Sequence, residues 1–248
     1  MSTKRYYGCK ADIADARDLL FLPHATRLEQ AVDLRSKCPP VMDQGALGAC
    51  VWHALTSALR YTLIKASNPD VPLSRLQGYY DTRTLENDFG DTGCEIRNAI
   101  KVAMLSGVAP EDYWPYDVAQ YERGPSPATY ANLLPFDGLS YERVAIDPVA
   151  IKLALSSGVP VVVGMSVFDS FESDEVAATG MVPMPDLTKE SLVSAHAMLC
   201  VGFSQKPGCF TVRNSWGNGW GSAGDCYVPE EMLGSPLYTA DAWIIRPV

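Results

Sequence analysis

Apolar positions recur at helical spacing in three segments of the first half of the chain. The first segment spans about 48–67, where Asn68-Pro69 supplies a stop signal. The second spans 74 to about 82, and the third spans 94–106, with Gly107 suited to close it. The first half is therefore predicted to be mainly helical.

The pattern changes in the second half to short, β-branched or apolar runs. A single short helix is predicted first, because Asp147 is a capping residue and Pro148 suits the first helical turn. Five runs that are separated by Gly and Pro are then predicted as strands: 159–167, 195–203, 209–213, 225–229 and 242–246. We therefore predict an α+β protein with a helical lobe over about 32–138 and a β-rich lobe over about 139–248.

Residues 1–31 show no sustained periodicity and are predicted to form an N-terminal arm in front of the folded unit over 32–248. The exception is a short apolar patch at 19–23. The start of the arm carries basic residues but no apolar run long enough for a secretory signal. The localisation of the protein is therefore open, and the two possibilities are the cytoplasm and export by a signal-independent route.

Composition narrows the classes of partner. The chain has 248 residues, 47% of them hydrophobic, which is enough for a substantial core. Its formal net charge of -9 comes from acidic residues spread along the chain, so we expect neither a nucleic-acid substrate nor binding to anionic membranes. No run approaches the roughly 20 apolar residues that span a bilayer.

Cysteine and histidine are the residue types that carry candidate chemistry. Seven cysteines is an odd number, so disulfides alone cannot use all of them. Only three histidines are present, and neither CxxC nor HxxxH spacing occurs. We therefore expect no metal site.

Cys50 stands where a glycine-bearing turn, 41–49, enters the first predicted helix. The partial positive charge and unpaired amides of a helix N-terminus favour thiolate over thiol, which activates sulfur as a nucleophile. Taken alone, Cys50 would more often be a buried structural cysteine. Gln44 lies six residues upstream, where its amide could donate to an oxyanion beside the Cys50 amide. Alone, Gln44 would be an ordinary polar turn residue.

His196 lies at the mouth of an apolar strand in the β-rich half. A lone histidine there is usually structural. A cluster of polar, aromatic and glycine residues, 214–221, follows the next predicted strand and favours a functional role for His196 over a structural one. Within it, Asn214 could accept a hydrogen bond from one imidazole nitrogen, and Trp216 could shield that bond from water.

These motifs together resemble those of the papain-like, cathepsin-type cysteine proteases, over roughly residues 28–246. The resemblance implies two lobes, the left one helical and the right one like a β-barrel, with the active-site cleft between them. It also implies a role for each residue: nucleophile for Cys50, base for His196, orienting group for Asn214 and oxyanion donor for Gln44. Two positions depart from the family signature, Leu47 in place of a cysteine and Val51 in place of an aromatic residue.

The same resemblance implies which residues bind substrate. Gly93 resembles the glycine whose backbone holds the substrate as an added strand. The pocket for the side chain two positions before the cut is expected around Gly164, Ala197 and Ser194. The full set of expected substrate-binding residues is Gly93, Gly48, Gly164, Ser194, Ala195, Ala197 and Trp216.

The implied activity is that of a cysteine endopeptidase that hydrolyses peptide bonds through a thioester acyl-enzyme, without a cofactor. Cys50 and His196 are expected to rest as a thiolate-imidazolium pair, and the partners are protein or peptide substrates. Two alternatives stay open: a restrained member that only binds peptides, and an acyl transferase or deamidase with the same triad.

The arm before Val32 is far shorter than the folded propeptide of plant and animal members and resembles that of short bacterial ones. We expect it to lie over or beside the cleft, as a short propeptide or lid, with the patch 19–23 in an apolar specificity pocket. The alternative is a tail, or a strap on the back of the domain.

Overall fold

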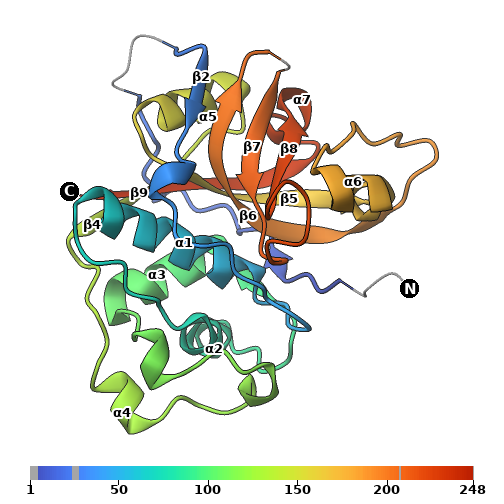
Figure 1. The fold of residues 1–248 in the computed structure, drawn as a ribbon. Coiled ribbons are helices and arrows are strands. Elements are labelled where there is room, and N and C mark those ends of the chain that lie inside the picture. Colours follow the sequence, from blue (N-terminus) through green and yellow to red (C-terminus); the bar gives the residue numbers. More distant parts are fainter. Residues whose placement is uncertain (1–4, 24–27, 207, 248) are drawn as a thin grey trace.

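The helical half packs around one central helix. The computed structural model describes residues 5–23, 28–206 and 208–247. Helix α1 (Cys50–Lys65) is buried along most of its length, because α2 (Arg75–Leu85) and α3 (Ile96–Ser106) cover one side and the sheet covers the other. Figure 1 shows α1 between the two halves, with α4 (Pro127–Tyr130) at the outer edge.

The second half is an antiparallel sheet in the order β4-β9-β5-β6-β7-β8, with the short β2 (Ala31–Asp33) paired to β6. Its strands are β4 (Leu139–Arg143), β5 (Val161–Phe168), β6 (Leu192–Ser204), β7 (Cys209–Arg213), β8 (Asp225–Pro229) and β9 (Thr239–Pro247). The predicted α+β fold with a helical and a β-rich half is confirmed. The barrel-like form expected for the β-rich half is not found, because among the described residues β4 and β8 end the sheet without pairing to each other.

Both faces of the sheet are covered, which explains why its central strands are apolar throughout. Along β5, Val161 and Val163 pack into a core that α5 (Pro148–Ser156) shares. Val162 points the other way, into the core around α1. Alternate side chains of a strand face opposite sides, so a strand covered on both sides must be apolar at every position. This packing fixes β6, and with it His196, against the start of α1.

The N-terminal segment contacts the rest of the molecule at two places, the strand β3 and the edge of the large sheet. Strand β1 (Cys9–Lys10) pairs in parallel with β3 (Cys94–Glu95), and Figure 1 shows this dark-blue segment between the two halves. Farther along, Leu20 bridges to Arg143 at the edge of the sheet. Phe21 is buried there, whereas its apolar neighbours at 19, 20 and 22 are exposed. The expectation that the patch 19–23 fills a specificity pocket is therefore wrong.

The predicted element bounds agree with the structure to within a few residues. Elements that the pattern did not indicate are β1, β2, β3 and β4, together with α4, α6 (Asp174–Thr179), α7 (Glu230–Leu233) and four 3-10 turns, 35–37, 111–113, 118–120 and 169–172. All seven cysteines are free thiols in this structure. None of the helices in the described residues has the length and apolarity needed to cross a bilayer.

Candidate active site

Cys50 is the first residue of α1 and is completely buried. Its Sγ accepts a hydrogen bond from the Ala197 amide at 3.4 Å, which joins the helix start to β6. The first turn of α1 contains no acidic residue, so the positive end of the helix dipole acts on the sulfur without compensation.

His196 lies on β6, immediately before Ala197. Its Nε2 is 2.7 Å from Asn214 Oδ1, whereas its buried Nδ1 has no hydrogen-bond partner among the described residues. The Trp216 ring stacks on the imidazole with the centroids 5.1 Å apart. Because Asn214 directly follows β7, the pairing of β6 with β7 brings the two side chains together.

Gln44 is held by the loop that carries Asn214. Its Oε1 accepts from Ser215 Oγ at 2.5 Å, and its backbone N–H donates to Ser215 O at 2.9 Å. Its Nε2 donates to Leu47 O at 2.9 Å and to Tyr6 O at 3.0 Å. The sequence analysis assigned no role to Ser215, although it directly follows Asn214 and makes two hydrogen bonds with Gln44.

A stretch of the N-terminal segment, 5–9, contacts these same groups. The Cys94 amide donates to Gly8 O at 2.9 Å. Gly8 passes so close to Gly48 that a Cβ on Gly8 would lie 1.7 Å from the Gly48 carbonyl oxygen. A Cβ on Gly93 would lie 2.2 Å from Gly8 O. Only glycine fits at this crossing.

Aromatic and cationic side chains of the same stretch cover the histidine. The Tyr7 ring meets the rings of His196 and Trp216 edge to face, at centroid distances of 5.4 and 5.9 Å. The Tyr7 hydroxyl donates to Glu172 at 2.5 Å, and the Arg5 guanidinium lies 4.5 Å from the Trp216 ring centroid. The sequence analysis expected the arm over or beside the cleft, but these contacts could not be predicted, because Tyr6-Tyr7-Gly8 has neither periodicity nor a known motif.

The side chain of Cys9, at the end of the stretch 5–9, lies in the expected substrate pocket. A Cβ on Gly164 would lie 2.9 Å from Cys9 Sγ and 3.7 Å from Asp241 Cβ. Ala197 is paired with Gly164 across the strands and is buried. Ser194 and Ala195, half-buried on the same strand, precede His196. The expected pocket residues therefore share one region of the β5–β6 pair.

Burial sets the charge state of the covered site. It raises the pKa of the Cys50 thiol to about 11, although N–H groups that include those of Ala197 and Gly8 oppose the shift. Burial also lowers the pKa of His196 to about 4, against the Asn214 hydrogen bond, which raises it. Desolvation disfavours the charged form of both groups, so a neutral thiol and a neutral imidazole are favoured while the segment is in place.

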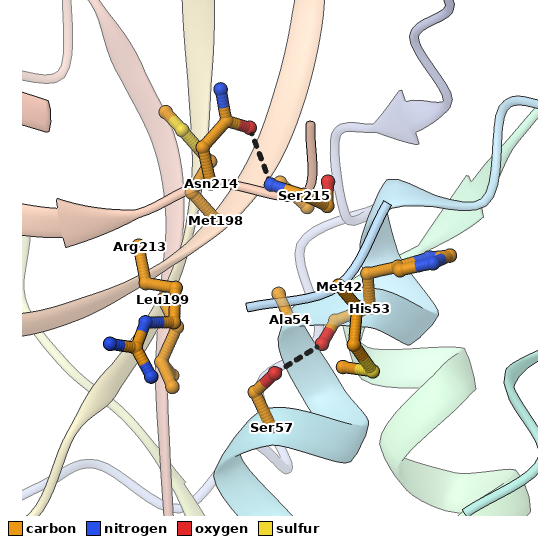
Figure 2. A pocket seen from close by; sticks show the side chains of 10 residues that line it. Met42, His53, Ala54, Ser57, Met198, Leu199, Arg213, Asn214 and Ser215 are labelled. Atoms are coloured by element: carbon orange, nitrogen blue, oxygen red, sulfur yellow. Dashed lines mark hydrogen bonds between the residues drawn. The ribbon is translucent and has the colours of Figure 1, made fainter. Parts of the chain in front are cut away.

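A cavity of about 10 Å³ lies behind the site, and Figure 2 shows Asn214, Ser57 and His53 among its lining side chains. It has room for about one water-sized sphere and is too small for a peptide side chain. His53 lines it with both ring nitrogens engaged, by Ala49 O and by the Arg75 guanidinium. Burial lowers the pKa of His53 to about 3, which leaves it a neutral structural residue.

Comparison with known proteins shows the family to which the chain belongs. The model of the papain family of cysteine proteases matches residues 28–232. The chain belongs to this family, and it is a cysteine protease, that is, a peptide hydrolase. The expectation drawn from the sequence motifs is thereby confirmed at the level of the family.

Among solved structures, xylellain, a cysteine protease from Xylella fastidiosa, is 33% identical with a TM-score of 0.90, and the match covers 100% of this chain and 98% of that one. This similarity confirms the predicted resemblance to short members of the family. Digestive procathepsin L 3 of Tenebrio molitor, 21% identical with a TM-score of 0.72, shares the fold, over 93% of this chain and 75% of its own.

Among curated sequences, an uncharacterised peptidase C1-like protein of Acanthamoeba polyphaga mimivirus is 36% identical over 217 residues, or 84% of this chain and 70% of its own. Cysteine proteinase 1 of Entamoeba histolytica is 28% identical over 203 residues, which cover 79% of this chain and 62% of that protein. The chain therefore spans less than two thirds of the Entamoeba relative.

Proposed function

We propose that the protein is an endopeptidase in which Cys50 is the nucleophile, His196 the general base and acid, and Asn214 the group that orients the imidazole. The observation that carries this assignment is the 2.7 Å contact of His196 Nε2 with Asn214 Oδ1, which leaves Nδ1 available for proton transfer. Trp216, stacked on the ring, keeps water from that hydrogen bond.

In this mechanism Cys50 Sγ passes its proton to His196 Nδ1 once the arm has left, and the resulting thiolate attacks the scissile carbonyl carbon to form a C–S bond. Gln44 Nε2 and the Cys50 amide stabilise the oxyanion. The His196 imidazolium then protonates the leaving amine as the C–N bond breaks. Water, deprotonated by His196, attacks the thioester, and sulfur leaves as thiolate. The contact of Gln44 Nε2 with the Tyr6 carbonyl supports a donor role, because a carbonyl oxygen already occupies that position.

The substrate groove in this proposal follows Gly164 and Ala197, then Gly93 and Gly48, and ends at Trp216; Ser194 and Ala195 flank it. Support comes from the residues 5–9, which contact most of this path. Tyr7 O approaches Gly48, Gly8 O approaches Gly93, and Cys9 Sγ approaches Gly164.

We further propose that the arm restrains the enzyme, because its residues 5–9 cover this groove. A substrate enters with its N-terminal part near Gly93 and its C-terminal part near Trp216. The arm runs the other way, because Arg5 lies over Trp216 whereas Cys9 pairs with Cys94, in parallel register. A reversed chain presents its peptide bonds in the wrong direction, so the arm can block the site without being cut there.

Labelling with an epoxysuccinyl inhibitor, followed by peptide mapping, tests the nucleophile. We expect modification of Cys50 and loss of all peptide hydrolysis in Cys50→Ala, with the variant folded. Cys209→Ala is the matched control, because Cys209 lies half-buried on β7 away from the groove, and it should keep full activity. Turnover near wild type in Cys50→Ala would sink the assignment.

The alternatives of a peptide-binding protein and an acyl transferase have no specific support in the described residues. Acyl transfer and hydrolysis of the thioester can be distinguished by product analysis with an added amine acceptor. Transfer gives an amide, whereas hydrolysis gives an acid. We expect the acid as the main product.

A further inference from the structure

Two arginines lie beneath the segment 12–18, beyond the catalytic groups. Arg97 is on the first turn of α3 and Arg143 ends β4. Their side chains are only 6% and 23% exposed. Arginine is rarely this buried without partners, and here most partners belong to the arm.

Asp12 of the arm sits in a seat built for a carboxylate. Its Oδ1 accepts from the backbone N–H of Arg97 at 3.1 Å, at the N-terminus of α3. Its Oδ2 accepts from Trp243 Nε1 at 2.7 Å and lies 3.7 Å from the Arg143 guanidinium. The backbone N–H of Asp12 donates to Asp241 at 3.0 Å, so both the side chain and the backbone of Asp12 are hydrogen-bonded to the catalytic domain.

Asp18 approaches the same two cations from the other side of a turn. Its Oδ2 lies 2.9 Å from Arg97 Nη1 and 3.5 Å from Arg143 Nη1. Arg97 also donates to the Ile13 carbonyl. Two carboxylates and one carbonyl of the arm thus converge on one pair of guanidinium groups.

The carboxylates of the catalytic domain leave part of this donor set unused. Arg143 pairs with Asp241 at 2.5 Å through Nη2, whereas its buried Nη1 has no hydrogen-bond partner among the described residues. Glu95 lies 3.9 Å from Arg97, beyond hydrogen-bond distance. When the arm is absent, Trp243 Nε1, the Arg97 amide and several guanidinium N–H groups face the groove together.

The seat continues the substrate groove. Cys9, whose sulfur lies against Gly164 in the expected specificity pocket, precedes Asp12 by three residues. At about 3.3 Å per extended residue, the seat lies roughly 10 Å beyond that pocket, on the side away from Trp216. The N-terminal part of a bound substrate would pass over it.

We propose that Arg97 and Arg143, with Trp243 Nε1, form a subsite for an acidic side chain of the substrate, and that the enzyme favours peptides with Asp or Glu a few residues before the cut. The proposal deepens the proposed function and rests on it, because the arm must leave for the subsite to open. In the present structure the carboxyl group of Asp12 takes the place of the substrate group. Burial, followed by the charge of Asp241, raises the pKa of Asp12 to about 6, so the preference for Asp or Glu is measured at pH 7.5, where the seated carboxyl is ionised.

The test uses the full chain with the triple change Gly8→Ala, Asp12→Asn and Asp18→Asn, which releases the arm from both the groove and the arginines. Matched peptides carry Asp, Asn or Ala at one of the third to sixth positions before the cleaved bond. We expect kcat/KM about tenfold higher for Asp than for Asn at one position, the ratio that one charge-assisted hydrogen bond supplies.

The same peptides are then measured after Arg143→Gln has been added, with Arg246→Gln as the matched control. Arg246 is on the neighbouring β9, where it pairs with Glu142 and makes no hydrogen bond or ion pair with the described residues of the arm. We expect Arg143→Gln to abolish the preference and Arg246→Gln to keep it. Circular dichroism confirms the fold, and Arg143→Lys provides a second variant that should keep part of the preference.

The outcomes separate the two claims. Hydrolysis with equal rates for Asp, Asn and Ala peptides at every position overturns the subsite and leaves the protease intact. A preference that survives Arg143→Gln also overturns it. Absence of hydrolysis in every variant, without labelling of Cys50, overturns the proposed function and the subsite with it.

Discussion

The two stretches of the arm that lie on the catalytic domain are held in different ways. Residues 5–9 use main-chain hydrogen bonds and aromatic contacts with Gln44, His196 and Trp216. Residues 12–18 are held by buried ion pairs with Arg97 and Arg143. The first stretch depends on close steric fit, and the second depends on charge.

This difference teaches how each end can be released. A close fit fails when one methyl group is added, because overpacking costs about 1–3 kcal/mol. A charge cluster tolerates small changes of shape but responds to neutralisation and to pH. Substitutions at the catalytic groups, at the glycine crossing and at the aspartates therefore test separate parts of the comparison.

The largest effect is expected at the groups that the first stretch covers. His196→Ala should lower kcat by about 10⁴-fold, the upper range for general acid-base catalysis, because it removes the base. Asn214→Ala should lower kcat less, since the base stays and only its orientation is lost. Steady-state kinetics on folded variants measures both, and equal losses would contradict the two roles.

Gln44→Ala should lower kcat by about 10²- to 10³-fold, the range for loss of one oxyanion donor. It also removes the hydrogen bond to Tyr6 O, so the arm should loosen while the chemistry slows. Ser215→Ala, which frees Gln44 Oε1, should cause a smaller loss in the same parameter. A change confined to KM would mean that Gln44 binds substrate and not the transition state.

Gly8→Ala should raise kcat/KM of the full chain by about tenfold or more, because its Cβ has no space against Gly48 O. Gly138→Ala is the matched control: a Cβ there meets no atom within 4 Å, so activity should not change. Activity is measured with active sites titrated. An unchanged or lower rate in Gly8→Ala would rule out restraint by the first stretch.

The proposed catalytic groups could be picked out from the sequence because each of them belongs to a local pattern. Cys50 follows a glycine turn at a helix start, and Asn214 follows a strand that pairs with the strand of His196. Their separation in sequence did not matter once the motifs were present. Strand β4 was missed, since Leu139 to Arg143 is mostly polar and only half-buried.

The path of the arm could not be predicted from the same patterns. Gly8 fits because of what it lacks, a Cβ, and its partner Gly48 is distant in sequence. The arginines that receive the aspartates lie on α3 and β4, and no periodicity links them to Asp12. The sequence analysis placed the apolar patch 19–23 in a specificity pocket because of its hydrophobicity. In the structure the patch contributes only the buried Phe21, at the edge of the sheet.

The smallest expected effect concerns the second stretch and the titration of Asp12. Three charged groups face this carboxyl: Arg97 on α3, Arg143 on β4 and Asp241 on β9. Burial and the nearby Asp241 raise the pKa of Asp12 to about 6. Between about pH 4, the ordinary pKa of aspartate, and pH 6, the docked arm therefore holds a proton that a free arm releases. This group favours docking in acid, and the gain is lost as pH rises through about 6, above which the docked carboxyl is ionised.

The full chain and its Asp12→Asn variant test this sign, because asparagine does not titrate. Rates of each are divided by those of the corresponding Gly8→Ala chain, which removes the pH dependence of the chemistry. The wild-type arm should restrain the enzyme a few-fold more strongly, relative to the variant, at pH 5 than at pH 7.5. A relative restraint that is constant, or stronger at pH 7.5, would mean that Asp12 stays ionised when docked. The expected result makes mild acid a poor signal for release at this end, so opening would have to begin at the glycine crossing.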